Sequence, residues 1–550
     1  MPPRPSPRPS PQPAPDPAAA TGPQSSRAPA TAAADEPGAY RAIPVARPVK
    51  GPDGSRPRFS SDQIGFLERA AAEYGDIFRF RLFGMPVIVL NNPDHIHQVL
   101  VGSRHKYDKE VLLYKLVRPV LRNGLITNPG GELYMRQRRM MQPAFRPAVV
   151  ARFADGMTDE TNSMLDRWGD RYRPGQVADL SAEFSELTLH IVTRTLFSAQ
   201  VGETARRFAE AFTETNDILG RFFRFPFPPL SVPTPAHRRL RRAIRRMDDC
   251  VSAFIERSST PANAANSAGP YADADAGAGK AGHGIDLLHL LMNAVDEEDG
   301  GGMDFEQLHH EVLNIVVGAY ETTTNAMAWA FQVLAERPDI EARLHEEIDT
   351  VLDGRPPGMD DLRRTPYARR VVEETLRMYS PAWQFMRRAR EEDVLGGHRI
   401  PAGSNIYINS YILHRRPEYW EDPDVFDPDR FTPERSKDRN RHAYMPFGAG
   451  ERICIGQHFA LVELHLVLLA IAQRYRFTLP PGQPPVRPRP LTTLHPGGGV
   501  HLEVRPRSGA AGGTPPAHDG GEGRDSGDGD GDGEAQDGRP GPAADPRSAS

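Results

Sequence analysis

The chain has 550 residues, of which 39% are apolar and 25% charged, a composition typical of a globular protein with a large core. Its net charge is −5, from 67 basic and 72 acidic residues, which argues against a nucleic-acid-binding protein. Two cysteines, Cys250 and Cys454, are too few for a disulfide framework. With no long apolar run and a proline-rich start, we expect no signal peptide, no transmembrane anchor and a cytoplasmic location.

Three segments have the composition of disordered chain. Residues 1–37 form a Pro/Ala-rich leader, and residues 508–550 form an acidic Gly/Asp-rich tail with a net charge of −6. Residues 258–284 are rich in Ala, Gly and Asn, and are predicted to be a low-complexity inserted loop. No other linker interrupts residues 38–507, which we predict to form one large domain.

Most of this domain is predicted to be helical, with a smaller β region. In chain order, Phe78, Phe80 and Leu82 alternate with arginines, and the segment 83–86 then turns into the apolar run 87–90, which predicts a β-hairpin. Asp304 and Gln307 form a capping-box start for a long helix that reaches about Ala335. A second helix is predicted from Thr365-Pro366 to near Pro381, and a third, strongly apolar one after Gly456.

One of the two cysteines lies in a distinctive loop, which runs from Phe447 to Gly456 with the sequence FGAGERICIG. Its glycines permit tight backbone geometry around Cys454. The start of a helix then places backbone amides near the sulfur, which favours a thiolate able to ligate iron. An isolated cysteine is more often a small buried apolar residue, and this is our interpretation of Cys250.

This loop, F-G-x-G-x-R-x-C-x-G, resembles the haem-binding loop of the cytochrome P-450 family. Two upstream motifs, in the family's order, support the resemblance: Glu374-Thr375-Leu376-Arg377 is similar to E-x-x-R, and Pro428-Asp429-Arg430-Phe431 to P-x-R-F. The spacing of Glu374 and Arg377 puts both on one helix face, where Arg430 can close a three-membered charge network. The resemblance spans roughly residues 55 to 505.

The resemblance implies a haem b cofactor whose iron is ligated by Cys454. It also implies that Glu321 and Thr322, in the helical segment Gly318-Ala319-Tyr320-Glu321-Thr322, relay protons to dioxygen. The alternative for Thr322 is a hydroxyl that only bonds back to the preceding turn. Ala319 stands where the family more often has glycine, so the extent of helix distortion there stays open.

Further residues match cofactor-binding positions of the family. The haem carboxylates need cationic partners, and arginine suits them. Arg138, with Tyr134 in place of the family's tryptophan, matches one such position, and Arg388 and Arg452 match two more. The match of the cysteine loop assigns Phe447 to the haem as well.

By resemblance, the activity is that of a haem-thiolate monooxygenase, which inserts one oxygen atom from O2 into a hydrophobic substrate such as a terpenoid, fatty acid or steroid-like molecule. Since no flavin or dinucleotide fingerprint is present, electrons are expected from a separate ferredoxin or flavodoxin with its reductase. The resemblance implies a docking face on the cysteine side, where Arg136, Arg139 and Arg441 are expected to offer positive charge to an acidic partner. Residues 221–230, rich in phenylalanine, match the entrance lid and could contact a membrane surface.

Two alternatives to this activity stay open. One is a peroxide-using or hydroperoxide-rearranging haem-thiolate enzyme, which needs no acid and threonine pair. The other is a non-catalytic haem-binding sensor, which would bind ligands without forming product.

Overall fold

The computed structural model describes residues 40–48, 58–197, 202–224, 230–258 and 287–507. The chain divides into two units, Met1–Ser508 and Gly509–Ser550, and all described residues belong to the first. The predictions for the leader, for nearly all of the inserted loop and for the tail therefore lie outside the described residues. The domain boundaries stay predictions.

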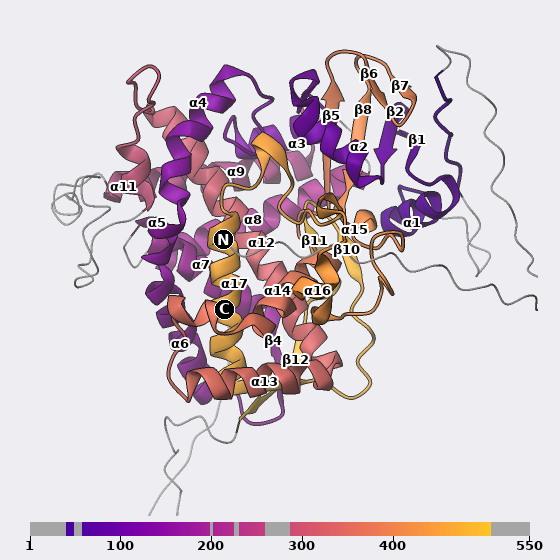
Figure 1. Cartoon of the computed structure of the whole chain (residues 1–550). Helices are drawn as coiled ribbons and strands as arrows, with labels where there is room; N and C mark the ends of the chain where they lie inside the picture. The colour runs from indigo at the N-terminus through magenta and orange to yellow at the C-terminus, as the bar shows by residue number, and fades with distance from the viewer. Residues whose placement is uncertain (1–39, 49–57, 198–201, 225–229, 259–286, 508–550) are drawn as a thin grey trace, which may run out of the picture. The chain divides into compact units, whose positions relative to one another are not determined.

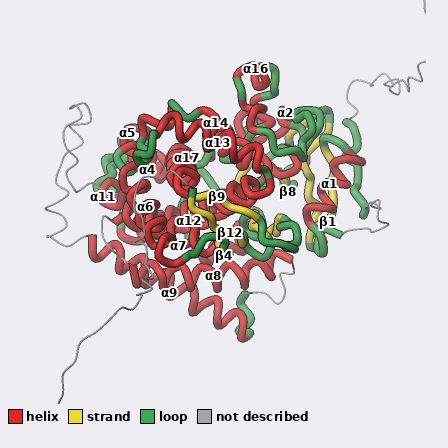
Figure 2. Tube along the Cα trace, turned by 90° about the horizontal axis from the view of Figure 1, so that it is seen from below, coloured by secondary structure: helices red, strands yellow, loops and turns green. Residues whose placement is uncertain are grey.

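Helices make up most of the described chain (Figures 1 and 2). They are α1 Gln63–Tyr74, α2 Pro93–His97, α3 Leu112–Leu121, α4 Glu132–Met141, α5 Pro147–Ala151, α6 Ala154–Arg171, α7 Leu180–Phe197, α8 Gly202–Arg224, α9 Pro235–Ser258, α11 Leu287–Met292, α12 Phe305–Glu336, α13 Pro338–Leu352, α14 Pro366–Met378, α15 Ser410–Leu413, α16 Pro433–Ser436 and α17 Gln457–Arg474.

Short strands complete the fold and confirm the predicted mainly α architecture with a smaller β region. They are β1 Ile77–Leu82, β2 Met85–Leu90, β3 Tyr107–Asp108, β4 Gln176–Asp179, β5 Gln384–Ala389, β6 Asp393–Leu395, β7 His398–Ile400, β8 Asn405–Asn409, β9 Tyr475–Thr478, β10 Pro488–Pro490, β11 Leu494–Pro496 and β12 His501–Pro506. In Figure 2, the sheet that contains β1 and β8 lies with α1 to one side of the helices.

The long helix α12 has 32 residues and begins as predicted. The Asp304 side chain accepts a hydrogen bond of 2.7 Å from the Gln307 amide, which satisfies one of the unpaired donors of the first turn. From Asn325 to Leu334 every residue is buried. A helix buried on all sides needs apolar residues all round, which explains why this half shows no polar stripe.

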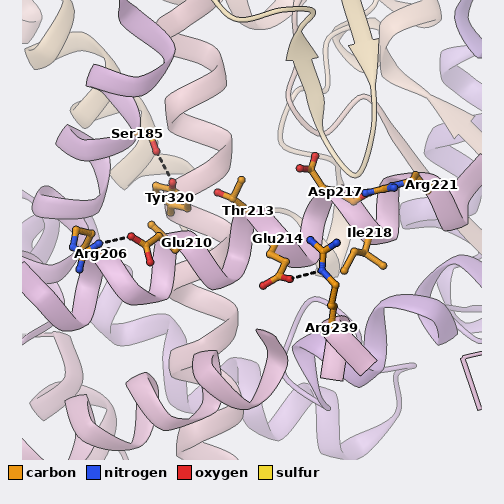
Figure 3. A pocket seen from close by; sticks show the side chains of 11 residues that line it. Ser185, Arg206, Glu210, Thr213, Glu214, Asp217, Ile218, Arg221, Arg239 and Tyr320 are labelled. Atoms are coloured by element: carbon orange, nitrogen blue, oxygen red, sulfur yellow. Dashed lines mark hydrogen bonds and ion pairs between the residues drawn. The ribbon is translucent and has the colours of Figure 1, made fainter. Parts of the chain in front are cut away.

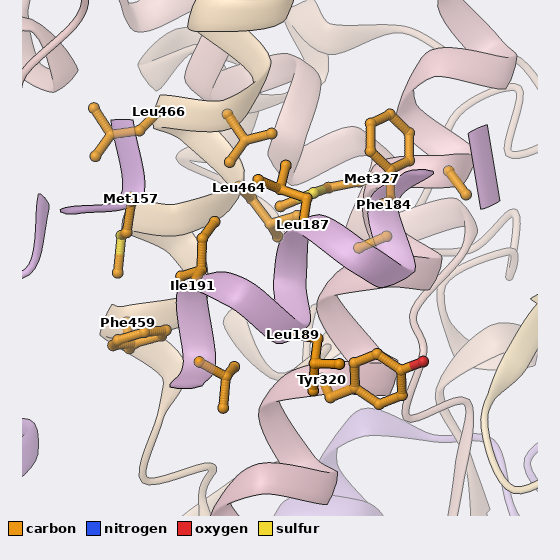
Figure 4. Close-up of a cluster of buried hydrophobic side chains, with 14 of the residues drawn as sticks. Met157, Phe184, Leu187, Leu189, Ile191, Tyr320, Met327, Phe459, Leu464 and Leu466 are labelled. Carbon is orange, nitrogen blue, oxygen red and sulfur yellow. The ribbon is translucent and has the colours of Figure 1, made fainter. Parts of the chain in front are cut away.

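The largest apolar core lies where α12 packs against α7 and α17, and α17 also packs against α6. Figure 4 shows part of it, with side chains from these four helices, among them Leu187, Met327 and Leu464, turned toward one another. The rings of Phe184 and Phe331 lie 5.3 Å apart between α7 and α12. This packing fixes α12 relative to α17, the helix that follows the cysteine loop.

The five-stranded sheet has the order β1-β2-β8-β5-β3. The predicted hairpin is present: β1 and β2 pair antiparallel, with Ile77 opposite Leu90, around Phe83 (φ 51°) and Gly84 (φ 80°). Positive φ at both turn residues is typical of a two-residue hairpin turn. A separate hairpin, β10–β11, contacts α12, since Asn325 donates to Thr493 at 3.1 Å. Within the described residues, none of the helices is both long and apolar enough to cross a membrane.

Candidate active site

The cysteine loop between β8 and α17 is shaped by its glycines. Gly448 and Gly450 have φ of 74° and 72°, in the left-handed region that other residues rarely adopt. A Cβ on Gly450 would lie 2.2 Å from the Leu100 carbonyl oxygen, so only glycine fits at this contact. The Cys454 amide donates to the Phe447 carbonyl at 2.9 Å and closes the loop. The chain is thereby held in a turn, and Cys454 lies two residues before Gly456, the N-cap residue of α17.

The Cys454 side chain has an exposed surface, although protein surrounds it closely. Burial raises the pKa of the Cys454 thiol, and the Gly456 amide and the Arg138 charge partly offset this effect. A buried thiol of raised pKa loses its proton when a metal ion binds, because the metal charge outweighs the desolvation. Cys250, by contrast, is buried in the apolar core, as its interpretation required.

Four basic side chains gather beside this loop: Lys109 follows β3, Arg138 lies on α4, Arg387 on β5 and Arg452 two residues before Cys454. Burial lowers the pKa of Lys109 well below its usual value, and the charges of the three arginines add to the effect. Burial, followed by the Arg387 charge, lowers the pKa of Arg452 to about 10. Among the described residues, no carboxylate forms an ion pair with any of the four.

Neutral groups hold this cluster in place. Lys109 donates to the Ile126 carbonyl at 3.0 Å, and Arg452 donates to the Asn128 and Pro129 carbonyls at 3.1 and 2.9 Å. The Arg452 guanidinium lies 3.9 Å from the centre of the Tyr134 ring. The Tyr134 hydroxyl accepts from Arg138 at 3.3 Å and donates to the Glu451 carbonyl at 3.1 Å. Buried cations without a counter-charge indicate a site for an anionic ligand.

The structure separates Arg388 from this cluster. Its guanidinium pairs with Asp108 at 2.6 Å and is more than one-third exposed. Arg387, the preceding residue, is buried instead and is the arginine of β5 whose charge acts on Lys109 and Arg452. Because successive side chains of a strand point to opposite faces, an assignment shifted by one residue selects the wrong face. The expectation for Arg388 is therefore corrected to Arg387.

The acid and threonine of α12 lie in different environments. The buried Glu321 carboxylate accepts hydrogen bonds from Asn216, Thr493 and His495. The Thr322 hydroxyl donates to the Gly318 carbonyl at 2.6 Å, one turn earlier. This is the arrangement expected if the hydroxyl bonds back to the preceding turn. Helix α12 is continuous through this segment. A hydroxyl whose proton is used in this way keeps its oxygen lone pairs free to accept a further hydrogen bond.

Glu374, Arg377 and Arg430 form a buried network. Glu374 pairs with Arg377 at 2.7 Å and with Arg430 at 3.2 Å, and the Glu374 and Arg377 side chains are completely buried. The remaining guanidinium protons of both arginines go to backbone carbonyls of the segment 414–425. This network therefore ties α14 to the irregular chain that leads to the cysteine loop.

The segment Leu125–Ile126 was not expected from the sequence to carry a role. Glu311 and Asn314 of α12 accept hydrogen bonds from the Leu125 and Ile126 amides at 3.0 and 3.1 Å. They hold the segment that places the Ile126 side chain 3.6 Å from the position of a Cβ on Gly318. Ile126 thus lies one turn of α12 from Thr322 and gives this region an apolar surface.

A pocket over α8 and α9 is distinct from this region (Figure 3). Charged side chains line much of it, including Arg206, Glu210, Glu214 and Arg239, several of which pair with one another. None of its residues belongs to the cysteine loop or to the basic cluster. It is an open surface depression rather than an enclosed chamber.

The donor set fits a haem with its two carboxylates. Cys454 supplies one sulfur at the start of a helix, and Lys109, Arg138, Arg387 and Arg452 supply unneutralised positive charge beside it. No cluster of His, Cys, Asp and Glu that could bind a metal ion directly occurs in the described part of the chain. A single thiolate is sufficient for iron when a porphyrin provides the other ligands.

These features define a haem-thiolate protein. A family model for cytochrome P450 matches residues 55–502, and the chain belongs to this family. The family binds haem b with a thiolate-coordinated iron, so haem b is the cofactor.

Relatives and solved structures agree with this assignment. Cyclooctatin synthase of Streptomyces melanosporofaciens is 36% identical over 425 residues, covering 76% of this chain and 87% of the relative. Pentalenene oxygenase of Streptomyces avermitilis is 35% identical, covering 78% of this chain and 90% of the relative. The crystal structure of the cytochrome P450DA heme domain superimposes with a TM-score of 0.72 at 24% identity, over 86% of this chain and 99% of that domain, which supports the fold.

The predicted activity class is confirmed: the protein is an oxygen-incorporating oxidoreductase, as its relatives named as monooxygenases and oxygenases are. Sequence reasoning missed Lys109 and Arg387. Lys109 stands between Asp108 and Glu110 and has the local pattern of a solvated charge cluster. Arg387 and Arg388 are adjacent, and the chain itself does not reveal which of them faces inward.

Proposed function

We propose that this cytochrome P450 oxygenates a terpenoid, with electrons from a separate ferredoxin or flavodoxin. The observation that carries the proposal is that three relatives with at least 34% identity are named for such reactions: cyclooctatin synthase, pentalenene oxygenase and cyclooctat-9-en-7-ol 5-monooxygenase. The apolar contact between Ile126 and α12 supports it, since a terpenoid offers mainly hydrocarbon surface.

In this proposal Cys454 would hold the haem iron as a thiolate, and Phe447 keeps the cysteine loop closed by accepting the Cys454 amide. Arg138, Arg387, Arg452 and Lys109 would hold the two haem carboxylates, with Tyr134 orienting Arg138 and Arg452. Without the haem carboxylates these four positive charges have no counter-charge. We therefore expect these residues to contribute to haem binding rather than to the stability of the haem-free fold. When bound, the haem supplies the iron chemistry that activates O2 for transfer of one oxygen atom.

Glu321 and Thr322 have the proton-handling roles. The Thr322 oxygen, with its proton donated to Gly318, is oriented to accept a hydrogen bond from water or from a protonated group. Glu321, one residue earlier, holds or releases a proton at its carboxylate. The Glu374, Arg377 and Arg430 network has a structural role, because it fixes the segment that positions the cysteine loop.

The electron donor is proposed from the absence of a cofactor fingerprint in the sequence, and its docking face needs revision. Arg136 and Arg139, candidates for an acidic partner's contact, pair with Asp299 at 2.7 Å and Asp296 at 2.9 Å. Much of their charge is thus neutralised within the chain, and Arg441 is the better remaining candidate. The cytoplasm is the proposed compartment, on the low cysteine content. A membrane contact through residues 221–230 stays a proposal, since 225–229 lie outside the described residues.

The test is reconstitution with a surrogate ferredoxin and its reductase. The purified protein is given pentalenene and cyclooctat-9-en-7-ol in separate reactions under isotopically labelled O2. We expect a product that carries one labelled oxygen atom and depends on the reductant. Turnover with hydrogen peroxide alone, or binding without product from any apolar compound tested, contradicts the proposal and favours a peroxide-using enzyme or a sensor.

A further inference from the structure

The carboxylate of Glu321 is held on a single oxygen by three side chains from other elements. Its Oε1 accepts from Asn216 Nδ2 on α8 at 2.6 Å, from Thr493 Oγ1 at 2.9 Å and from His495 Nε2 at 2.7 Å. Asn216 is itself held by Thr492, and Thr493 by Asn325. The hairpin β10–β11 thus reaches α12 at the acid that the proposed proton transfer uses.

The three donors differ in what they can do. Asn216 and Thr493 are buried and do not titrate near neutral pH. His495 is the titratable member, and its imidazole has two nitrogens that can each carry a proton. Its Nε2 is used by the hydrogen bond to Glu321, and Nδ1 has no hydrogen-bond partner among the described residues.

The two side chains of this contact differ in solvent exposure. The His495 side chain is 25% exposed, whereas that of Glu321 is 8% exposed. The pair therefore spans from solvent to a buried carboxylate through a single hydrogen bond.

We propose that His495 relays protons from solvent to Glu321. A water molecule donates a proton to Nδ1 and leaves hydroxide in the solvent, while the Nε2 proton passes to Glu321 Oε1, so that the ring gains one proton and loses one. The imidazole then returns to its first tautomer by proton exchange with water. This inference rests on the proposed function, because it names the supplier of the protons that Glu321 handles.

The elements packed against this contact also carry charged residues. Glu321 is contributed by α12, Asp217 and Arg221 by α8 next to Asn216, and Arg489 by β10 as the cross-strand neighbour of His495. Gly220 of α8 approaches Leu491 of the hairpin, and Figure 3 shows the hairpin above Asp217 and Arg221. The pH dependence of the turnover rate must therefore be measured in an Arg489→Gln variant as well as in the wild type.

The decisive variant is His495→Gln, because a glutamine amide can keep the hydrogen bond to Glu321 but cannot transfer a proton. We expect product formation from pentalenene or cyclooctat-9-en-7-ol to fall about tenfold or more, with a larger solvent deuterium isotope effect and more O2 reduced without product. Substrate affinity, measured by the spectral shift, should stay within about twofold of wild type.

Two controls separate relay from structure. Thr493→Val removes a hydrogen bond to the same oxygen without removing a proton carrier, so its solvent isotope effect should equal that of wild type. His501→Gln changes an exposed histidine of β12 whose ring contacts the Gly498 carbonyl, and this change should leave rate and isotope effect unchanged. A His495→Gln enzyme with wild-type rate, coupling and isotope effect overturns the relay, as does a slower one whose isotope effect and coupling are unchanged.

A second readout needs no turnover. In the diamagnetic ferrous carbonyl form, the Nε2 proton of His495 should give a hydrogen-bonded NMR signal that is lost in His495→Gln. In Glu321→Gln it should exchange faster with water. If the wild type oxygenates neither pentalenene nor cyclooctat-9-en-7-ol, the terpenoid proposal fails, and the NMR signal then tests the relay independently. Absence of this signal in the wild type overturns the relay.

Discussion

At the scale of single residues, the site depends on buried charges whose partners lie in the cofactor or in the protein. Arg387 and Arg388 form a matched pair for testing this. Arg387→Met should speed haem loss to apomyoglobin about tenfold, because one charge-assisted contact to a haem carboxylate is removed. Arg388→Met, which removes the half-exposed pair with Asp108, should leave the rate of haem loss unchanged. Faster loss in Arg388→Met alone would restore the first assignment.

Glu463 provides a test of a buried carboxyl group. It is fully buried on α17, and a contact with the Thr323 side chain only partly offsets the cost of burying its charge. Burial raises the pKa of Glu463 to about 8. Because the folded state holds this proton more tightly than the unfolded state, the stabilisation is complete below about pH 4.5 and is lost as the pH rises toward 8.

The comparison is with Glu463→Gln, which cannot ionise. Between pH 5 and pH 9 the free energy of unfolding of the wild type should fall, relative to this variant, by on the order of 3 kcal/mol. Denaturant unfolding at several pH values measures it. A constant difference across this range would contradict a folded-state pKa near 8 for Glu463.

At the scale of elements, the cysteine loop tests how closely backbone geometry controls the ligand. Gly450→Ala places a Cβ against the Leu100 carbonyl, whereas Gly448→Ala meets no atom within 4 Å, although both positions have positive φ. Both variants should be destabilised by about 1 kcal/mol from the backbone conformation alone. Gly450→Ala should lose more, and should retain less haem on purification. Equal effects would mean that the contact with Leu100 relaxes freely.

The network between α14 and the segment before the cysteine loop is a second element-scale device. Glu374→Gln leaves Arg377 and Arg430 buried without their carboxylate and should cost about 3 to 5 kcal/mol in unfolding free energy. The control is Glu373→Gln, on the same helix, whose partner Arg369 is largely exposed. It should cost less than about 1 kcal/mol. A loss of similar size in both variants would contradict the network's role.

Local pattern predicted the helices and the β1–β2 hairpin well, because capping at Asp304 and the turn at Phe83-Gly84 act within a few residues. The motif residues Cys454, Glu374 and Arg377 could also be predicted, because each motif lies within one short stretch of sequence. The cluster of Lys109, Arg387 and Arg452 was not, because it joins the end of β3, β5 and the cysteine loop, and its burial depends on their packing. The contact between His495 and Glu321 likewise joins elements 174 residues apart.

At the scale of the whole molecule, the boundaries at 38 and 507 rest on composition. A chain of residues 38–507 should unfold with the same midpoint as the full chain and bind haem with the same stoichiometry, because the predicted leader and tail lack the apolar residues needed to extend the core. Thermal unfolding and haem titration of both chains provide the comparison. A midpoint lowered by several degrees would show that a terminal segment packs on the domain.

The central claim is that Cys454 ligates the haem iron as a thiolate, and the ferrous carbonyl absorption spectrum tests it most directly. We expect the wild type and Cys250→Ser to show the red-shifted main band of a thiolate-ligated haem. Cys454→Ser should lose this band or shift it to shorter wavelength. An unchanged red-shifted band in Cys454→Ser would contradict the account.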